Sequence, residues 1–295
     1  MVLSIIIGLN AAIDQLVSQA FGQRDFKLCG VYHNRGQTIL LLFFVPLSIV
    51  PLFYGEPLLL FLGQDAAVVK NAQKYMIYMM PGVLLYGVYD CLKRFLNAMH
   101  ITFVPALAQI IAVILYLPAS YWLVFKCKTF GHMEALGLAY TINSVCLLIF
   151  TFIYSLFLKQ IEGALQMVDM TVFKNWGEYL KISLPSTVML CAEWWAYELL
   201  MVFAGNISVE SLVAQIMCMT CIATLFMFAI GLQEATCACL GEAIGAGNVP
   251  AANKFFWISF KCAAVTMLIL SVVFLMNLKD ITELFSSDPA VQELA

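Results

Sequence analysis

The chain has 295 residues, of which 63% are apolar and only 11% are charged. A soluble globular domain carries roughly 25% charged residues, so this composition excludes an ordinary soluble protein and predicts an integral membrane protein. The formal net charge is −3, and the basic residues are scattered along the chain. That distribution excludes a nucleic-acid-binding protein or a polybasic lipid anchor. We expect the lipid bilayer to be the protein's partner, and we expect the protein to be a monomer.

Eight segments are long and apolar enough to cross a bilayer, which requires about 20 predominantly apolar residues. In chain order they cover residues 1–21, 33–54, 73–97, 102–126, 135–159, 180–204, 212–244 and 254–276. The sequence therefore predicts an all-α polytopic membrane protein. Membrane helices tolerate proline where neighbouring groups satisfy the freed carbonyls, so we expect kinks rather than helix ends at Pro46, Pro81, Pro105, Pro118 and Pro185.

The first segment carries a row of polar residues. Asn10, Asp14 and Ser18 share one helix face at intervals of four, and Gln15 and Gln19 form a neighbouring stripe. An intramembrane aspartate is a candidate for ion or substrate binding, so Asn10, Asp14 and Gln15 are candidate site residues. Polar residues at this spacing also join helices by hydrogen bonds, and this structural interpretation is slightly favoured.

Charged residues also lie near the end of the third segment. Asp90, Lys93 and Arg94 are expected to pair with one another or to extend toward the membrane surface. Lysine and arginine are commoner on the connections after segments 1, 3, 5 and 7, with nine residues, than on the opposite side, with five. Because cytoplasmic loops are enriched in Lys and Arg, we predict that residues 22–32 and 160–179 face the cytoplasm.

Most of the ten cysteines lie in apolar runs and are expected to be packing residues. Cys218 and Cys221 have the spacing of a metal or redox motif, but no second pair and no nearby histidine accompany them. We therefore expect no metal site and no cofactor.

The sixth segment contains two glutamates, in the run "AEWWAYELL" at residues 192–200. Glu193 is predicted near the bilayer midplane and Glu198 about 7.5 Å farther out, at 1.5 Å rise per residue. A charged residue at the helix centre costs about 2.5–3.5 kcal/mol on insertion scales, so two of them indicate a polar cavity rather than lipid. A buried carboxylic acid that gains and loses a proton is suited to coupling, and neighbouring aromatic faces bind organic cations. The candidate binding residues here are Glu193, Glu198, Trp194, Trp195 and Tyr197. The alternative is a purely structural role, in which the glutamates form hydrogen bonds to neighbouring helices and the tryptophans are packing residues.

An internal repeat relates residues 8–25, "GLNAAIDQLVSQAFGQRD", to residues 231–248, "GLQEATCACLGEAIGAGN", at an offset of 223. The register holds without a gap for 65 positions, with 13 identities. The offset equates segments 1 and 2 with segments 7 and 8, so the period is six helices. An even number of crossings keeps both copies in the same orientation, which is a plan used by secondary transporters.

The repeat predicts two six-helix bundles, both incomplete in this chain. We assign residues 1–160 to an N-terminal bundle without its first helix, residues 161–179 to a cytoplasmic linker, and residues 180–295 to a C-terminal bundle without its last three helices. Because the repeat has a period of six helices, one helix is expected before residue 1 and three are expected after residue 295.

Several runs resemble the eukaryotic branch of the multidrug and toxic compound extrusion (MATE) transporters. They are "AAIDQLVSQAFGQRDFKLCG", "YMIYMMPGVLLYGVYDCLKRFLNAM", "LPSTVMLCAEWWAYELL" and "GEAIGAGN", which are similar to that family's second, fourth, seventh and eighth helices. The resemblance implies an antiporter of twelve helices that exports organic cations or xenobiotics in exchange for protons or sodium, in the plasma or vacuolar membrane. One departure is that residues 216–225 lack the acidic residue found there in some members.

The same sequence features bear on four alternative functions. A lipid or oligosaccharide flippase would be expected to line its cavity with cations, whereas the intramembrane charges here are mainly acidic. A receptor needs no six-helix duplication, and no catalytic arrangement of His or Asp favours an enzyme. A non-transporting fragment is the remaining alternative.

Overall fold

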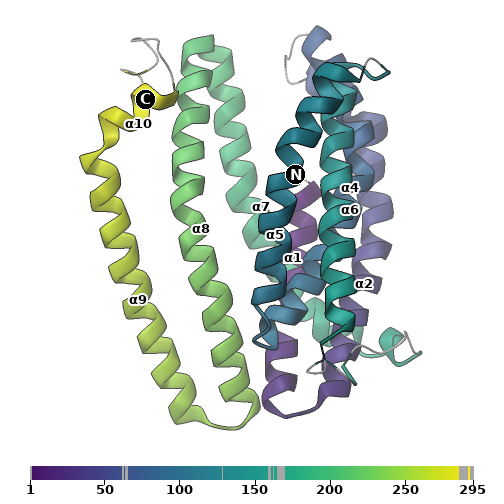
Figure 1. Ribbon diagram of the computed structural model, residues 1–295, viewed down its shortest axis with the longest axis vertical. Helices are drawn as coiled ribbons and strands as arrows, with labels where there is room; N and C mark the ends of the chain where they lie inside the picture. The colour runs from purple at the N-terminus through teal and green to yellow at the C-terminus, as the bar shows by residue number, and fades with distance from the viewer. Residues whose placement is uncertain are drawn as a thin grey trace.

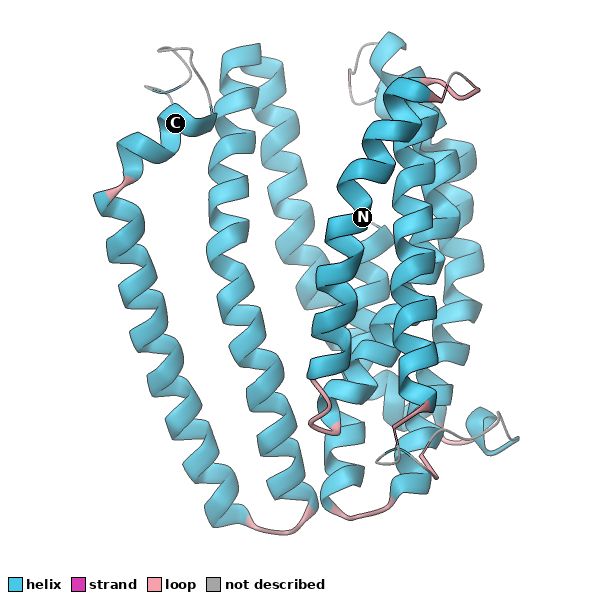
Figure 2. Cartoon of the chain, in the orientation of Figure 1, coloured by secondary structure: helices cyan, strands magenta, loops and turns pink. Residues whose placement is uncertain are grey.

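The computed structural model describes residues 2–61, 63, 66–127, 129–158, 161, 163–164, 170–285 and 292. In these residues the chain is helical and has no strand (Figure 1, Figure 2). The elements are α1 Val2–Gly22, α2 Phe26–Ile49, η1 Val50–Tyr54, α3 Gly55–Phe61, α4 Ala66–Ala98, α5 Phe103–Tyr121, η2 Trp122–Lys126, α6 His132–Leu156, η4 Met170–Phe173, α7 Trp176–Ile207, α8 Val209–Gly245, α9 Val249–Met276 and α10 Leu278–Phe285.

The predicted all-α membrane fold is confirmed, with one refinement of the helix count. Within the described residues, seven helices are both long and apolar enough to cross a membrane, and one of these spans, Phe26–Phe61, comprises α2, η1 and α3. The predicted segment 73–97 lies in α4, which has 33 residues but is not among the seven. This helix carries five Lys, Arg and Asp residues and packs against α1 and α6, so protein rather than lipid surrounds its charged half.

Four of the five prolines lie inside helices, as expected: Pro46, Pro81, Pro118 and Pro185. Two helices change locally to the wider π-helical turn, at Val50–Tyr54 after Pro46 and at Trp122–Lys126 after Pro118. The expectation of a kink at Pro105 was wrong, because α5 begins at Phe103. Proline fits the first turn of a helix, where the backbone N–H has no intrahelical partner.

α1 is the packing centre of the molecule, since it contacts α2, α4, α7 and α8. Its buried residues Ile6, Ile13 and Val17 belong to the main core together with residues of α2 and α4. α7 approaches α1 closely, because a Cβ placed on Gly8 would lie 2.5 Å from Cα of Thr187. Small residues allow membrane helices to come this near.

The turn after α1 and the turn after α8 repeat each other at the predicted offset of 223. The amide of Asp25 donates to the carbonyl of Ala20 at 3.1 Å, and that of Asn248 donates to Ala243 at 2.9 Å. The same two residues cap the helices that follow, since their side chains accept from the amides of Leu28 and Ala251. Arg24 and Gly247, also paired by the offset, both have positive φ, at 59° and 70°.

The contact between α1 and α8 follows the same symmetry. A Cβ on Gly22 would overlap the backbone of Glu242, and a Cβ on Gly245 would overlap the backbone of Gln19. Adding 223 to Gly22 and Gln19 gives Gly245 and Glu242, so the repeat maps one contact onto the other. Ser18 and Gly241, which contact each other between these two points, are also 223 positions apart. Such a pattern requires a pseudo-two-fold axis through the Ser18–Gly241 contact, and the two turns lie side by side at the lower end of Figure 1.

This symmetry supports the parallel repeat over residues 18–28 and 241–251. The last part of the predicted match, residues 286–291 and 293–295, lies outside the described residues, as do residues 165–169 of the predicted linker.

Candidate functional site

Glu193 lies near the middle of α7, which spans Trp176–Ile207. Its side chain is half-buried, and no hydrogen bond or ion pair joins it to another residue that the structure describes. Glu198, one and a half turns farther along, is also half-buried. At 3.6 residues per turn the two carboxylates diverge by about 140°, so they cannot clamp one ion together.

The aromatic residues beside Glu193 have different surroundings. The indole N–H of Trp195 donates to Oγ of Ser4 at 3.1 Å, and that hydroxyl lies 3.6 Å from Sγ of Cys191. These contacts attach the middle of α7 to the first turn of α1. Trp194 and Tyr197 are half-buried.

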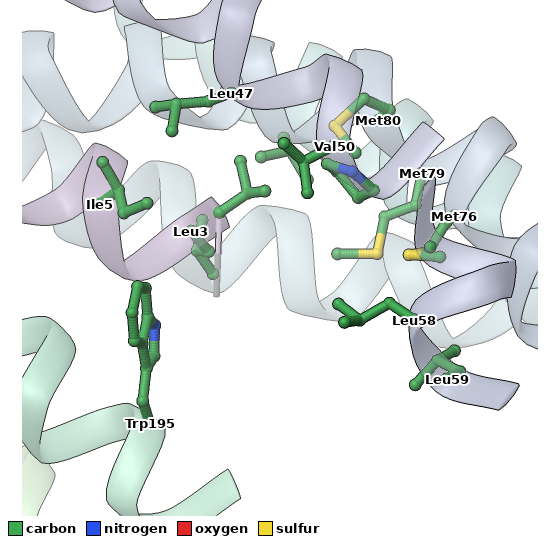
Figure 3. A pocket seen from close by; sticks show the side chains of 14 residues that line it. Leu3, Ile5, Leu47, Val50, Leu58, Leu59, Met76, Met79, Met80 and Trp195 are labelled. Atoms are coloured by element: carbon green, nitrogen blue, oxygen red, sulfur yellow. The ribbon is translucent and has the colours of Figure 1, made fainter. Parts of the chain in front are cut away.

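Trp195 also lines an apolar cavity of about 470 Å³ between α1, α2, η1, α3 and α4 (Figure 3). Leu3 and Ile5 of α1 lie on the same side as the indole, and Met76, Met79 and Met80 of α4 lie on the far side. Methionine adapts to irregular apolar shapes, so this cavity is suited to an aromatic or aliphatic group. It contains none of the predicted acidic residues.

Asn10 and Asp14 of α1 bind α4 instead. The amide nitrogen of Asn10 donates to Oδ2 of Asp90 at 3.0 Å and to the carbonyl of Gly87 at 3.1 Å, and Asp14 accepts from the guanidinium of Arg94. Asp90 and Arg94 are themselves joined at 2.8 Å. Gln15, the other candidate on α1, is exposed.

This polar cluster extends to α8 through three residues that were not predicted as site residues: Lys93, Asn97 and Glu234. Nζ of Lys93 lies 2.9 Å from Oε1 of Glu234, and the amide of Asn97 donates to Oε2 of Glu234 at 3.0 Å. Lys93 also lies 3.7 Å from Asp90. The position of Glu234 inside an apolar segment was the available signal, since an intramembrane acidic residue is a candidate functional residue by default.

The structure thus places the predicted residues in two groups. Asn10 and Asp14 belong to the cluster between α1, α4 and α8, whereas Glu193, Trp194, Trp195, Tyr197 and Glu198 lie on α7. All hydrogen bonds of the Asn10 and Asp14 side chains in the described residues go to α4. Asp90 and Arg94 are paired and at most 9% exposed, so they do not extend to the membrane surface.

Known proteins resemble this chain over nearly its whole length. The MatE family profile matches residues 1–122 and 185–295. The chain belongs to the MatE family. It is 29% identical to Protein DETOXIFICATION 12 of Arabidopsis thaliana and 30% identical to Multidrug and toxin extrusion protein 1 of Xenopus tropicalis, in each case over 97% of its residues.

The MatE fold is also seen in a solved structure. The crystal structure of the eukaryotic MATE transporter AtDTX14 superposes on 99% of this chain with a TM-score of 0.91 and 24% identity, and the match covers 65% of that chain. The chain spans 59% and 50% of the lengths of the Arabidopsis and Xenopus relatives. The expected resemblance to the eukaryotic branch is therefore confirmed, and this MatE protein is an integral multi-pass membrane protein.

Proposed function

We propose that this MatE protein is a secondary transporter that exports organic cations in exchange for protons or sodium. The observation that carries the proposal is the half-buried Glu193 at the middle of α7, which has no partner among the described residues. A carboxylate in an apolar helix is costly, and a bound cation or proton offsets that cost. Competition between the cation and the coupling ion for one carboxylate would link their movements.

The surroundings of Glu193 support an organic rather than an inorganic cargo. Trp194 and Trp195 follow it directly, and an aromatic face attracts a cation by about 2 kcal/mol when both are desolvated. The apolar cavity beside Trp195 would accept the uncharged part of such a molecule. The proposal includes a monomer in the plasma or vacuolar membrane, with bundles at residues 1–160 and 180–295 and a linker at 161–179.

The charges of the interior argue against a flippase for phosphate-bearing lipids or oligosaccharides. Such cargo needs available cations, and two cations of the polar cluster, Lys93 and Arg94, are instead held by Glu234, Asp90 and Asp14. Neither cation is therefore free to bind a phosphate.

Transport by the full-length protein in proteoliposomes tests the proposal. A fluorescent organic cation should accumulate when a pH or sodium gradient is imposed and should stop accumulating when the gradient is collapsed. A fluorescent phospholipid in the same vesicles should exchange no faster than in protein-free liposomes. Lipid exchange without cation uptake would favour the flippase, and neither activity would favour the non-transporting alternative.

A further inference from the structure

The face of α8 that meets α1 is formed by Glu234, Ala238, Gly241 and Gly245, which are spaced at four, seven and eleven residues from the first. Gly241 contacts Ser18, and Gly245 is so close to Gln19 that a Cβ would overlap its backbone. Ala238 is only 5% exposed. The two helices are therefore in direct contact over the last turn of α8, from Gly241 to Gly245.

Charged contacts from α4 secure the same face. Both carboxylate oxygens of Glu234 are held, Oε1 by Lys93 at 2.9 Å and Oε2 by Asn97 at 3.0 Å. Farther along, Nε2 of His100 lies 2.7 Å from Oε2 of Glu242. These contacts join residues separated by 137 to 142 positions in the chain, and they lie toward the end where the α1–α2 and α8–α9 turns meet (Figure 1).

The charge balance allows α8 to move away from α1 and α4 without leaving an unpaired charge on those two helices. Asp14, Asp90, Lys93 and Arg94 all belong to α1 and α4, and their charges sum to zero when all four are ionised. When α8 moves away, the N-terminal helices retain a paired set. On α8, the Glu234 carboxylate then loses Lys93 and Asn97, and Glu242 loses His100. Water entering the opened gap would solvate both carboxylates.

We propose that Glu234 of α8, held by Lys93 and Asn97 of α4, is a latch that keeps this end of the molecule closed and that releases when the transporter opens toward the side of the α1–α2 turn. The inference rests on the proposed transport function, because a carrier must open alternately to its two sides. A close-packed interface held by a small number of polar contacts is the kind of element that can switch between two discrete arrangements.

Thiol labelling in the absence of substrate tests the latch without requiring transport. Cysteine replaces Ala238 in full-length protein whose native cysteines have been removed, and an impermeant thiol reagent is applied to each side of membrane vesicles in turn. With Glu234 intact, labelling should be slow from both sides. Glu234→Ala should accelerate labelling about fivefold or more, only from the side of the α1–α2 turn, since this is the size of effect that typical couplings produce.

Two further variants separate a latch from general loosening of the structure. Asn97→Ala, which removes a neutral donor, should accelerate labelling by a smaller factor. Lys74→Ala breaks the 3.7 Å ion pair with Glu134 between α4 and α6 and should leave the labelling rate unchanged. Unchanged labelling in Glu234→Ala, or equal acceleration from both sides or in Lys74→Ala, would overturn the latch. Cation uptake by the parent protein reports separately on the proposed function.

Discussion

Arg94 links two helices through two carboxylates. It binds Asp14 of α1 and Asp90 of its own helix, and its side chain is largely buried. Removing one partner of a buried ion pair leaves the other charges uncompensated, and that costs more than the pair itself contributes. Arg94 is therefore expected to be a structural residue whose loss affects folding before it affects transport.

We expect Arg94→Gln to lower the free energy of unfolding by about 3–5 kcal/mol, because Asp14 would lose its ion pair and Asp90 would keep only its pair with Lys93, at 3.7 Å. Thermal unfolding in detergent measures this effect. Lys74→Gln is the matched control, since Lys74 is 50% exposed and its pair with Glu134 is expected to contribute about 0–1 kcal/mol. Equal unfolding temperatures for the two variants would contradict the assignment.

Gly8 has a steric role at the contact between α1 and α7. Gly8→Ala should destabilise the protein by about 1–3 kcal/mol, because its Cβ would lie 2.5 Å from Cα of Thr187 and the helices would have to separate. Gly177→Ala, where nothing lies within 4 Å of the added carbon, should not destabilise it. The comparison of the two unfolding temperatures checks the contact; an unaffected Gly8→Ala variant would refute it.

At the scale of elements, the repeat explains why one position of each turn has positive φ. The first copy uses Arg24 there and the second copy uses Gly247. A left-handed backbone costs a residue with a Cβ about 1–2 kcal/mol, whereas glycine adopts it freely. Arg24 thus retains a conformational cost that its counterpart avoids.

Gly247→Ala should lower the free energy of unfolding by about 1–2 kcal/mol, because alanine would bear the cost that glycine avoids. Arg24→Gly should not lower it. Thermal unfolding of both variants tests whether the two turns are equivalent. Destabilisation by Arg24→Gly but not by Gly247→Ala would show that they are not.

The sequence predicted the helices from local composition and the repeat from identities at a constant offset of 223 residues. Apolar runs located the spans, and the offset of 223 aligned Asp25 with Asn248, which the structure shows to cap equivalent helices. The pairing of Lys93 with Glu234 was not predictable in the same way, because these residues are 141 positions apart and no periodic pattern relates them. The roles of Asn10, Asp14 and Glu193 in binding stay predictions.

At the scale of the whole molecule, the lower end in Figure 1 is predicted to face the cytoplasm. Gln23, in the α1–α2 turn, and Asn206, at the far end of α7, then lie on opposite sides of the membrane. In a cysteine-free background, an impermeant thiol reagent applied outside the cell should label Asn206→Cys and should not label Gln23→Cys. The reverse pattern would invert the orientation and, with it, the side to which the latch opens.

The polar residues of the different helices have different roles. Asp14, Asp90 and Arg94 join α1 to α4, and Glu234 joins α8 to α4. We propose that Glu193, in contrast, binds the transported cation. If this division of roles is correct, removing the charge of Glu193 affects transport and leaves stability nearly unchanged.

The most direct measurement is the uptake of a fluorescent organic cation into proteoliposomes with an imposed ion gradient, for full-length wild-type protein and for Glu193→Gln at equal reconstitution. Gln keeps the size and hydrogen-bonding groups of Glu193 but carries neither a charge nor a titrating proton. Glu56→Gln makes the same chemical change at an exposed position of α3 and is the control. Uptake should be lost in Glu193→Gln and retained in Glu56→Gln, with equal unfolding temperatures; wild-type uptake by Glu193→Gln would contradict the account.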